Sequence, residues 1–135
     1  MTAIETPVQV MFYDTDAGGV VHNLAYLRFI ELARTQLAEK MGMGMHEMTR
    51  TQRYPVVVRI EVDYKRPGML GDHLVVRGRL DDVTPSRFWF TFEIVRPSDG
   101  VLLVTSRQTC ALIQMPSGKP QRLPAAWMQH FQHKN

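Results

Sequence analysis

Apolar residues recur along the chain with two different periods, and each period predicts one kind of secondary structure. Between residues 23 and 41 they follow the spacing of one face of a helix: Tyr26, Phe29, Ile30, Ala33, Leu37 and Met41. Leu24 and Leu27 widen this apolar stripe, which indicates a helix largely surrounded by protein. Asn23 is the candidate N-cap, and Gly42 suits a left-handed C-cap.

Alternation with a period of two predicts strands in the rest of the chain. It is clearest over residues 56–65, where one face is expected to be buried: Val58, Ile60, Val62 and Tyr64. Further strands are expected over residues 8–12, 73–82, 88–95 and 101–115. A short helix over residues 125–131 is expected to lie on the body through Trp127, Met128 and Phe131.

These elements predict one α+β domain over residues 1–135. The four later strands form an antiparallel meander, and one long helix covers only one face of such a sheet. The strand over residues 88–95 carries Phe88, Phe90 and Phe92 on one face, and Trp89 and Val95 mark its second face as apolar. That face therefore needs a partner, and a homo-oligomer is expected.

Composition narrows the class of protein. Apolar residues make up 44% of the chain and charged residues 21%, as in ordinary globular proteins. No apolar run approaches the roughly 18 residues of a membrane span, and the N-terminus lacks a signal-peptide pattern, so a cytoplasmic location without a membrane span is expected. The single cysteine, Cys110, excludes an internal disulfide and is interpreted as a small buried hydrophobe.

Charge and histidine spacing exclude two further kinds of site. The net charge of +3 suits an anionic ligand. The basic residues are scattered among acids without a recognition motif, so no nucleic-acid partner is expected. No metal site is expected either, because four histidines show no ligand spacing with one another or with paired carboxylates: His46, His73, His130 and His133.

The segment from Tyr13 to Arg34 carries the candidate chemistry. A polar turn with Asp14 and Asp16 is followed by two glycines and by the start of the long helix. A helix start offers unsatisfied N–H groups at its positive end. A carboxylate there can activate water while an N–H group holds a developing negative charge.

This segment, with its Asp-Thr-Asp-Ala-Gly-Gly sequence, resembles the hotdog-fold acyl-CoA thioesterases of the 4-hydroxybenzoyl-CoA thioesterase and YbgC type. The later Pro67-Gly68 and Gly71-Asp72 turns support the resemblance, which covers residues 8–115. It implies a curved antiparallel sheet of about five strands wrapped around one long central helix. It also implies a homodimer or homotetramer with the active site between subunits.

The resemblance implies hydrolysis of an acyl-CoA substrate to free acid and coenzyme A, with no cofactor beyond the coenzyme A of the substrate. Asp16 matches the catalytic carboxylate, as general base or nucleophile, and the backbone N–H of Asn23 matches the group that polarises the thioester carbonyl. Many YbgC-type sequences read Tyr-His where this chain has His22-Asn23. His22 is therefore expected to orient the thioester, to shuttle a proton or to cap the helix.

The remaining candidate residues each have a functional and a structural interpretation. Asp14 is more typical of a turn or cap residue. Tyr13 and Tyr26 line the pocket or belong to the core, and Gly19 allows a close approach of the backbone. Three cations flank predicted turns and either bind the phosphates of coenzyme A or are solvated: Lys65, Arg66 and Arg87.

Two alternative functions stay open on the same fold. One is a non-catalytic acyl-CoA-binding hotdog module, which keeps the pocket without needing Asp16. The other is an acyl-thioester dehydratase or hydratase, whose histidine motif is absent from this chain. The identity of the acyl group is not determined by the sequence.

Overall fold

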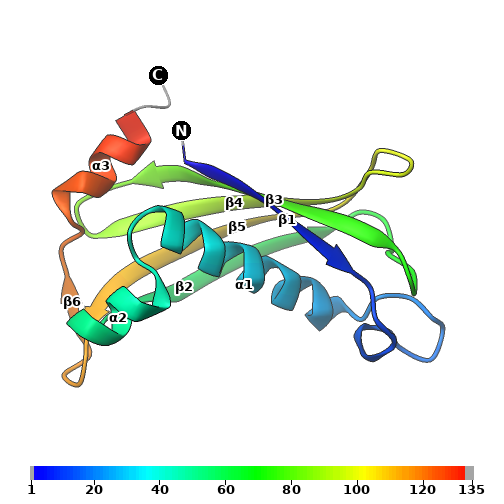
Figure 1. Cartoon of the computed structure of the whole chain (residues 1–135), viewed down its shortest axis with the longest axis horizontal. Helices are drawn as coiled ribbons and strands as arrows, with labels where there is room; N and C mark the ends of the chain where they lie inside the picture. The colour runs from blue at the N-terminus through cyan, green and yellow to red at the C-terminus, as the bar shows by residue number, and fades with distance from the viewer. Residues whose placement is uncertain (1, 133–135) are drawn as a thin grey trace.

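The computed structural model describes residues 2–132 and shows a curled antiparallel sheet around one long helix (Figure 1). The elements follow in this order: β1 (Ala3–Gln9), the 3-10 turn η1 (Phe12–Asp14), α1 (Asn23–Lys40), α2 (Met45–Thr51), β2 (Arg53–Tyr64), β3 (His73–Val83), β4 (Arg87–Arg96), β5 (Val101–Gln114), β6 (Lys119–Gln121) and α3 (Ala125–Gln132). The strand order is β1-β3-β4-β5-β2, and β6 pairs with β5. The predicted α+β class is confirmed, but the predicted meander of the four later strands is wrong: only β3, β4 and β5 follow one another in the sheet, because β2 pairs with β5 instead of β3.

The core lies between α1 and the sheet. Most of the predicted apolar stripe of α1 is buried, including Ile30, Ala33 and Leu37 at 0% exposure. Leu24, which was expected to widen the stripe, is 62% exposed at the first turn of the helix. Three phenylalanines of β4 face it from the sheet, as expected: Phe88, Phe90 and Phe92. A Cβ atom on Gly78 of β3 would lie 2.7 Å from the Phe92 ring, so the glycine makes room for that ring.

The prediction of a buried face on β2 is wrong. Val58, Ile60 and Tyr64 are 47%, 42% and 49% exposed, because β2 is an edge strand and α1 packs mainly against β1 and β3. A bulge between Val57 and Arg59 also shifts the alternation. Periodicity alone does not distinguish an edge strand from a central one.

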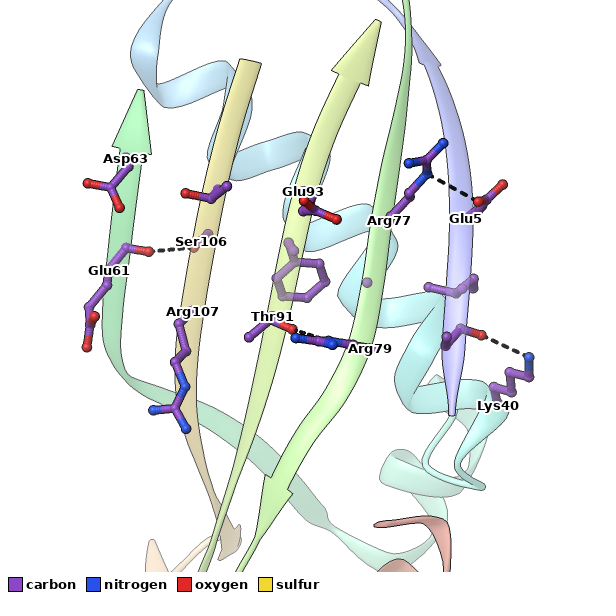
Figure 2. A pocket seen from close by; sticks show the side chains of 15 residues that line it. Glu5, Lys40, Glu61, Asp63, Arg77, Arg79, Thr91, Glu93, Ser106 and Arg107 are labelled. Carbon is purple, nitrogen blue, oxygen red and sulfur yellow. Dashed lines mark hydrogen bonds and ion pairs between the residues drawn. The ribbon is translucent and has the colours of Figure 1, made fainter. Parts of the chain in front are cut away.

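The outer face, which is the face of the sheet turned away from α1, also differs from expectation. Instead of apolar side chains it carries charges, among them Arg77, Arg79, Glu93 and Arg107 (Figure 2). Trp89 is half-buried beneath the guanidinium of Arg107, which lies 5.4 Å from the ring centre. The prediction that an apolar outer face needs a partner is therefore wrong, and exposed apolar side chains lie along β2 instead.

Several element boundaries differ from prediction. The first strand spans Ala3–Gln9 rather than residues 8–12, because Asp14 closes a turn through Met11. Two short elements, α2 and β6, lie outside the helices and strands that the sequence predicts. The expected C-terminal helix is α3. Its Trp127 ring packs edge-on against the Phe88 ring with 4.8 Å between ring centres, and Met128 packs against the core. The side chain of Phe131 lies outside the described part of the chain. The predicted burial of Cys110 is confirmed. Within residues 2–132, no helix is long and apolar enough to cross a membrane.

Candidate active site

Asp14 anchors the turn that precedes the candidate site. Its buried carboxylate accepts a hydrogen bond from the Met11 N–H at 2.9 Å and pairs with the Arg28 guanidinium on α1. Its backbone carbonyl accepts a hydrogen bond from the His22 N–H at 2.8 Å. The interpretation of Asp14 as a turn residue is therefore confirmed, and its ion pair ties the turn to the helix.

A small hairpin presents Asp16. The Asp16 N–H donates to the Val20 carbonyl at 3.0 Å, and Thr15 forms a bridge with Val21. Gly19 has a φ of 73°, which a residue with a side chain rarely adopts, and its N–H donates to the Asp16 carbonyl at 3.1 Å. Gly19 thus closes the turn that carries the candidate carboxylate.

The loop after β2 holds this hairpin in place. The Val21 N–H donates to the Gly68 carbonyl at 2.9 Å, and the Gly68 N–H donates to the buried Tyr26 hydroxyl at 2.8 Å. Arg96 braces the same loop through an ion pair with Asp72 at 2.9 Å. Hydrogen bonds to Asp99 and Asp72 raise the pKa of Arg96, and burial raises the pKa of Tyr26.

The Asp16 carboxylate is exposed in the single chain. Its Oδ1 atom accepts a hydrogen bond from the Gly18 N–H at 2.9 Å, which orients the carboxylate. Burial in an apolar pocket would strengthen this carboxylate as a base. Among the described residues no such cover lies over Asp16, so a bound substrate or a second chain would have to supply it.

The start of α1 leaves one backbone donor available. The N–H groups of His22 and Ala25 donate to backbone carbonyls, and that of Leu24 donates to the His22 imidazole at 3.1 Å. Among the described residues, no hydrogen-bond acceptor is present for the Asn23 N–H, the first donor within the helix. The neighbouring orphan donors of the helix start are thus satisfied while this one is left open.

His22, rather than Asn23, is the N-cap of α1. The correction has a physical reason: the His22 Nδ1 atom accepts the Leu24 N–H, which an asparagine one position later is not placed to do. An accepting Nδ1 is unprotonated, so the hydrogen of the neutral ring lies on Nε2. Of the three roles expected for His22, the structure shows the capping role.

The other candidate residues are not all brought together. Tyr13 is 75% exposed beneath the Arg28 guanidinium, whereas Tyr26 is a core residue. Exposed Lys65 and Arg66 follow β2 beside the site, and both backbone N–H groups donate to the Leu103 carbonyl.

Arg87 lies at the other end of the sheet. It pairs with Ala111 of β5, and Ala111 pairs on its other side with Val56, nine residues before Lys65. That separation is about 30 Å along an extended strand. One chain therefore does not gather Arg87, Lys65 and Arg66 around a single phosphate group, and their roles in binding stay predictions.

A groove of about 580 Å³ runs between α1 and β2 from the candidate site. Tyr13 and His22 line it near the helix start, Leu24 and Leu27 line it along α1, and the side chains of β2 and β5 complete it: Val57, Ile60 and Gln108. A smaller, mostly apolar cavity of about 150 Å³ shares Arg34 and Val57 with this groove. The two spaces therefore lie next to each other.

A larger hollow lies on the outer face and differs from the groove in its lining. It measures about 790 Å³ and is lined largely by charged side chains, many of them labelled in Figure 2, where α1 lies behind the sheet. Several of these charges are already paired, as in Arg77 with Glu5 at 3.3 Å and Arg107 with Asp81 at 3.2 Å. None of the candidate catalytic residues lines it, so the groove between α1 and β2 is the better candidate.

Three features of this site carry no local signal in the sequence. Arg28 pairs with a residue 14 positions earlier, Tyr26 bonds to a loop 42 positions later, and Arg34 bonds to Gln108 across 74 positions. No group of three or more histidine, cysteine, aspartate or glutamate side chains that could hold a metal ion is found in the described part of the chain.

The comparison with known proteins decides the family. Residues 10–131 match the model of the thioesterase-like superfamily. The chain belongs to this superfamily. The YbgC acyl-CoA thioester hydrolase of Escherichia coli O6:H1 is 28% identical over 96% of both chains. The YbgC acyl-CoA thioesterase of Haemophilus influenzae is 29% identical over 94% of this chain and 93% of its own.

Solved structures agree with this placement. A probable thioesterase from Bartonella henselae superposes with a TM-score of 0.83 at 28% identity, over 90% of this chain and 99% of that one. A DHNA-CoA thioesterase from Staphylococcus aureus shares the fold with a TM-score of 0.88 at 22% identity, over 99% of this chain and 91% of its own. The expected hotdog fold and the expected enzyme class, a thioesterase, are confirmed. The roles of individual residues stay predictions.

Proposed function

We propose that this chain hydrolyses acyl-CoA thioesters to a free acid and coenzyme A at the start of α1. The observation that carries the proposal is the Asn23 N–H, which is left open on a helix start whose neighbouring donors are satisfied. The Asp16 carboxylate is presented by the adjacent hairpin, two positions before the Gly18 N–H that orients it. The YbgC relatives carry the same activity in their names.

In this proposal the thioester carbonyl accepts a hydrogen bond from the Asn23 N–H, and the positive end of α1 favours the charge that develops there. Asp16 takes a proton from water while the water oxygen attacks the carbonyl carbon. The tetrahedral intermediate then collapses, the carbon–sulfur bond breaks, and the coenzyme A thiolate leaves and is protonated.

A nucleophilic Asp16 is the alternative route to the same products. It forms an acyl anhydride and expels the thiolate, and water then hydrolyses the anhydride. A single turnover in ¹⁸O-labelled water tests this route. Direct attack by water places the label in the acid, whereas attack by Asp16 followed by hydrolysis at the aspartyl carbonyl of the anhydride leaves an enzyme oxygen in the acid and the label in Asp16. An unlabelled acid therefore identifies the nucleophilic route.

We further propose a homodimer that pairs the edges of β2. This strand has an unpaired edge and exposes Val58, Ile60 and Tyr64, which a second copy would cover. Such a dimer closes the groove between α1 and β2, which is open in the single chain. Sedimentation equilibrium measures the assembly; a monomer at micromolar concentration would contradict the proposal.

Two substitutions test the assigned groups. Asp16→Asn keeps the volume and removes the charge, and a loss of a general base is expected to lower kcat by about 10²–10⁴-fold. Asn23→Pro removes the N–H at the first helical position, where proline is tolerated, and the extended backbone of His22 (φ −64°, ψ 139°) suits a following proline. This variant is expected to lose about 10²–10³-fold in kcat.

Matched controls accompany both variants. Asn23→Ala keeps the backbone donor, and Glu93→Gln removes an exposed carboxylate on the outer face. Both are expected to retain the unmodified rate of thiol release across an acyl-CoA panel. An unchanged rate for Asp16→Asn would show that Asp16 is not the catalytic carboxylate. Binding of acyl-CoA without turnover by the unmodified protein would favour the non-catalytic module.

A further inference from the structure

Gln108 of β5 is a buried side chain with one half of its amide unpaired. It is 1% exposed, and its Oε1 atom accepts a hydrogen bond from Nη1 of Arg34 at 2.7 Å. Among the described residues, the Nε2 atom has no hydrogen-bond partner. Because a guanidinium only donates, the amide oxygen must face Arg34, and the NH₂ group must point elsewhere.

Gln108 and its partner Arg34 both line the groove between α1 and β2, which is therefore the space that the unpaired donor is inferred to face. A buried N–H group without an acceptor is unfavourable, and native proteins satisfy nearly all such groups. An acceptor carried by a molecule in the groove is placed to complete the hydrogen bonding of Gln108.

The charges of the groove indicate a neutral acceptor. Arg28 is paired with Asp14, and Arg34 lies 3.7 Å from the Glu31 carboxylate. Each of these two lining arginines thus has an acidic partner, and the unpaired group of Gln108 is itself neutral. A ketone, hydroxyl or ether oxygen matches this donor, whereas a carboxylate would have no unpaired cation beside it.

Two routes through the fold place Gln108 along the groove. The Tyr64 hydroxyl donates to the Asn23 carbonyl at 3.2 Å, and Tyr64 pairs with Val104, four residues before Gln108 on β5. Four residues of strand span about 13 Å. Along α1, Arg34 follows Asn23 by eleven residues, or about 16 Å. The donor therefore lies about ten to thirteen bonds of an extended chain from a carbonyl at Asn23, at about 1.2 Å per bond.

The space next to the groove is more apolar. The smaller cavity that shares Arg34 and Val57 with the groove is lined by Met48, Phe88, Phe90 and Trp127. An acyl chain that starts at Asn23 would pass one polar position at Gln108 and then end among aromatic side chains.

We propose that Gln108 is a specificity-determining residue, which selects acyl groups that carry a neutral oxygen acceptor part-way along a long chain. The oxygen accepts a hydrogen bond from Nε2 while Arg34 holds the other side of the amide. This inference rests on the proposed function, because it places the thioester at the start of α1.

Pairs of acyl-CoA substrates test the inference. Each pair consists of a saturated chain and the same chain with one ketone, which is moved in steps from beside the thioester to about thirteen bonds away. For the unmodified protein, kcat/KM is expected to favour the ketone by about five- to tenfold at ten to thirteen bonds, the effect of one neutral hydrogen bond. A preference for the ketone that is greatest when the ketone lies next to the thioester would overturn the proposal.

Two variants assign the preference to Gln108. Gln108→Leu removes the donor and is expected to abolish the preference for the ketone. Gln108→Glu keeps the volume and a contact with Arg34 but replaces the NH₂ group by an oxygen, so the saturated chain is expected to become the better substrate. Gln114→Leu is the matched control on the same strand; its Nε2 bonds to backbone carbonyls, and the ratio should not change.

Binding separates this inference from the proposed function. Calorimetric titration of Asp16→Asn protein with each substrate pair measures the preference without turnover. Hydrolysis of all chains with equal kcat/KM and equal affinity would overturn the role of Gln108 and leave the thioesterase proposal intact. A ketone preference in binding without hydrolysis by unmodified protein would overturn the proposed function alone.

Discussion

Tyr26→Phe isolates one hydrogen bond that ties the central helix to the candidate site. The Tyr26 hydroxyl is buried and accepts the Gly68 N–H at 2.8 Å, and the Gly68 carbonyl accepts the Val21 N–H from the site hairpin. Phenylalanine keeps the ring, which packs edge-on against Phe29 at 6.3 Å and lies 5.7 Å from the Tyr64 ring. The substitution therefore removes only the hydroxyl group and its hydrogen bond with the Gly68 N–H.

The expected loss of unfolding free energy is set by the Gly68 N–H, which Tyr26→Phe leaves without an acceptor. A buried amide without an acceptor costs about 1–3 kcal/mol, more than the net value of the hydrogen bond itself. For a chain of 135 residues, the typical unfolding entropy converts this loss into a decrease in Tm of about 4–10 °C. Amide exchange at Gly68 is expected to become faster, because its N–H loses its acceptor.

Guanidinium chloride unfolding at one fixed protein concentration measures the change, since association alters apparent stability. Tyr64→Phe is the matched control: its hydroxyl donates to the Asn23 carbonyl at 3.2 Å, but the residue is 49% exposed, so a loss below about 0.5 kcal/mol is expected. Equal stability of Tyr26→Phe and the unmodified protein would refute the reasoning.

Two further predictions concern the core. Gly78→Ala is expected to lower the unfolding free energy by about 1–3 kcal/mol, because the new Cβ would meet the buried Phe92 ring at 2.7 Å; a stability within error of the unmodified protein in denaturant unfolding would contradict this. Burial raises the pKa of the Cys110 thiol from 9.0 to about 11. The neutral thiol therefore contributes fully to the free energy of unfolding below pH 9, and this contribution is lost as the pH rises through 11. Between pH 9 and pH 11 the free energy of unfolding of the unmodified protein is therefore expected to fall by up to about 2 kcal/mol more than that of Cys110→Ala. Parallel pH profiles of unfolding free energy for the two proteins would exclude this contribution.

The sequence predicted those parts of the fold that depend on local pattern. The apolar stripe of α1 and the buried phenylalanines of β4 are where periodicity placed them, because a helix or strand turned towards a core must bury one face. The same reasoning failed for β2. Val58 and Ile60 alternate like core residues, but their exposure depends on the position of β2 at the edge of the sheet.

The candidate site divides in the same way. The motif around Asp16 and Asn23 is contiguous and supports a family resemblance that the superfamily match confirms. Which helix-start donor stays open could not be predicted, because it depends on His22 acting as the cap and on Asp14 accepting the His22 N–H.

By itself, the sequence determined a long amphipathic helix, an antiparallel sheet and a carboxylate motif next to the helix start. These are short-range features, and hydrophobic period and turn chemistry specify them residue by residue. Only the tertiary structure decided that Tyr26 supports the Gly68 loop and that Arg34 leaves one side of the Gln108 amide unpaired. The physical reason is that burial and hydrogen-bond satisfaction are properties of residues that meet across 42 and 74 positions, and strand order decides which residues meet.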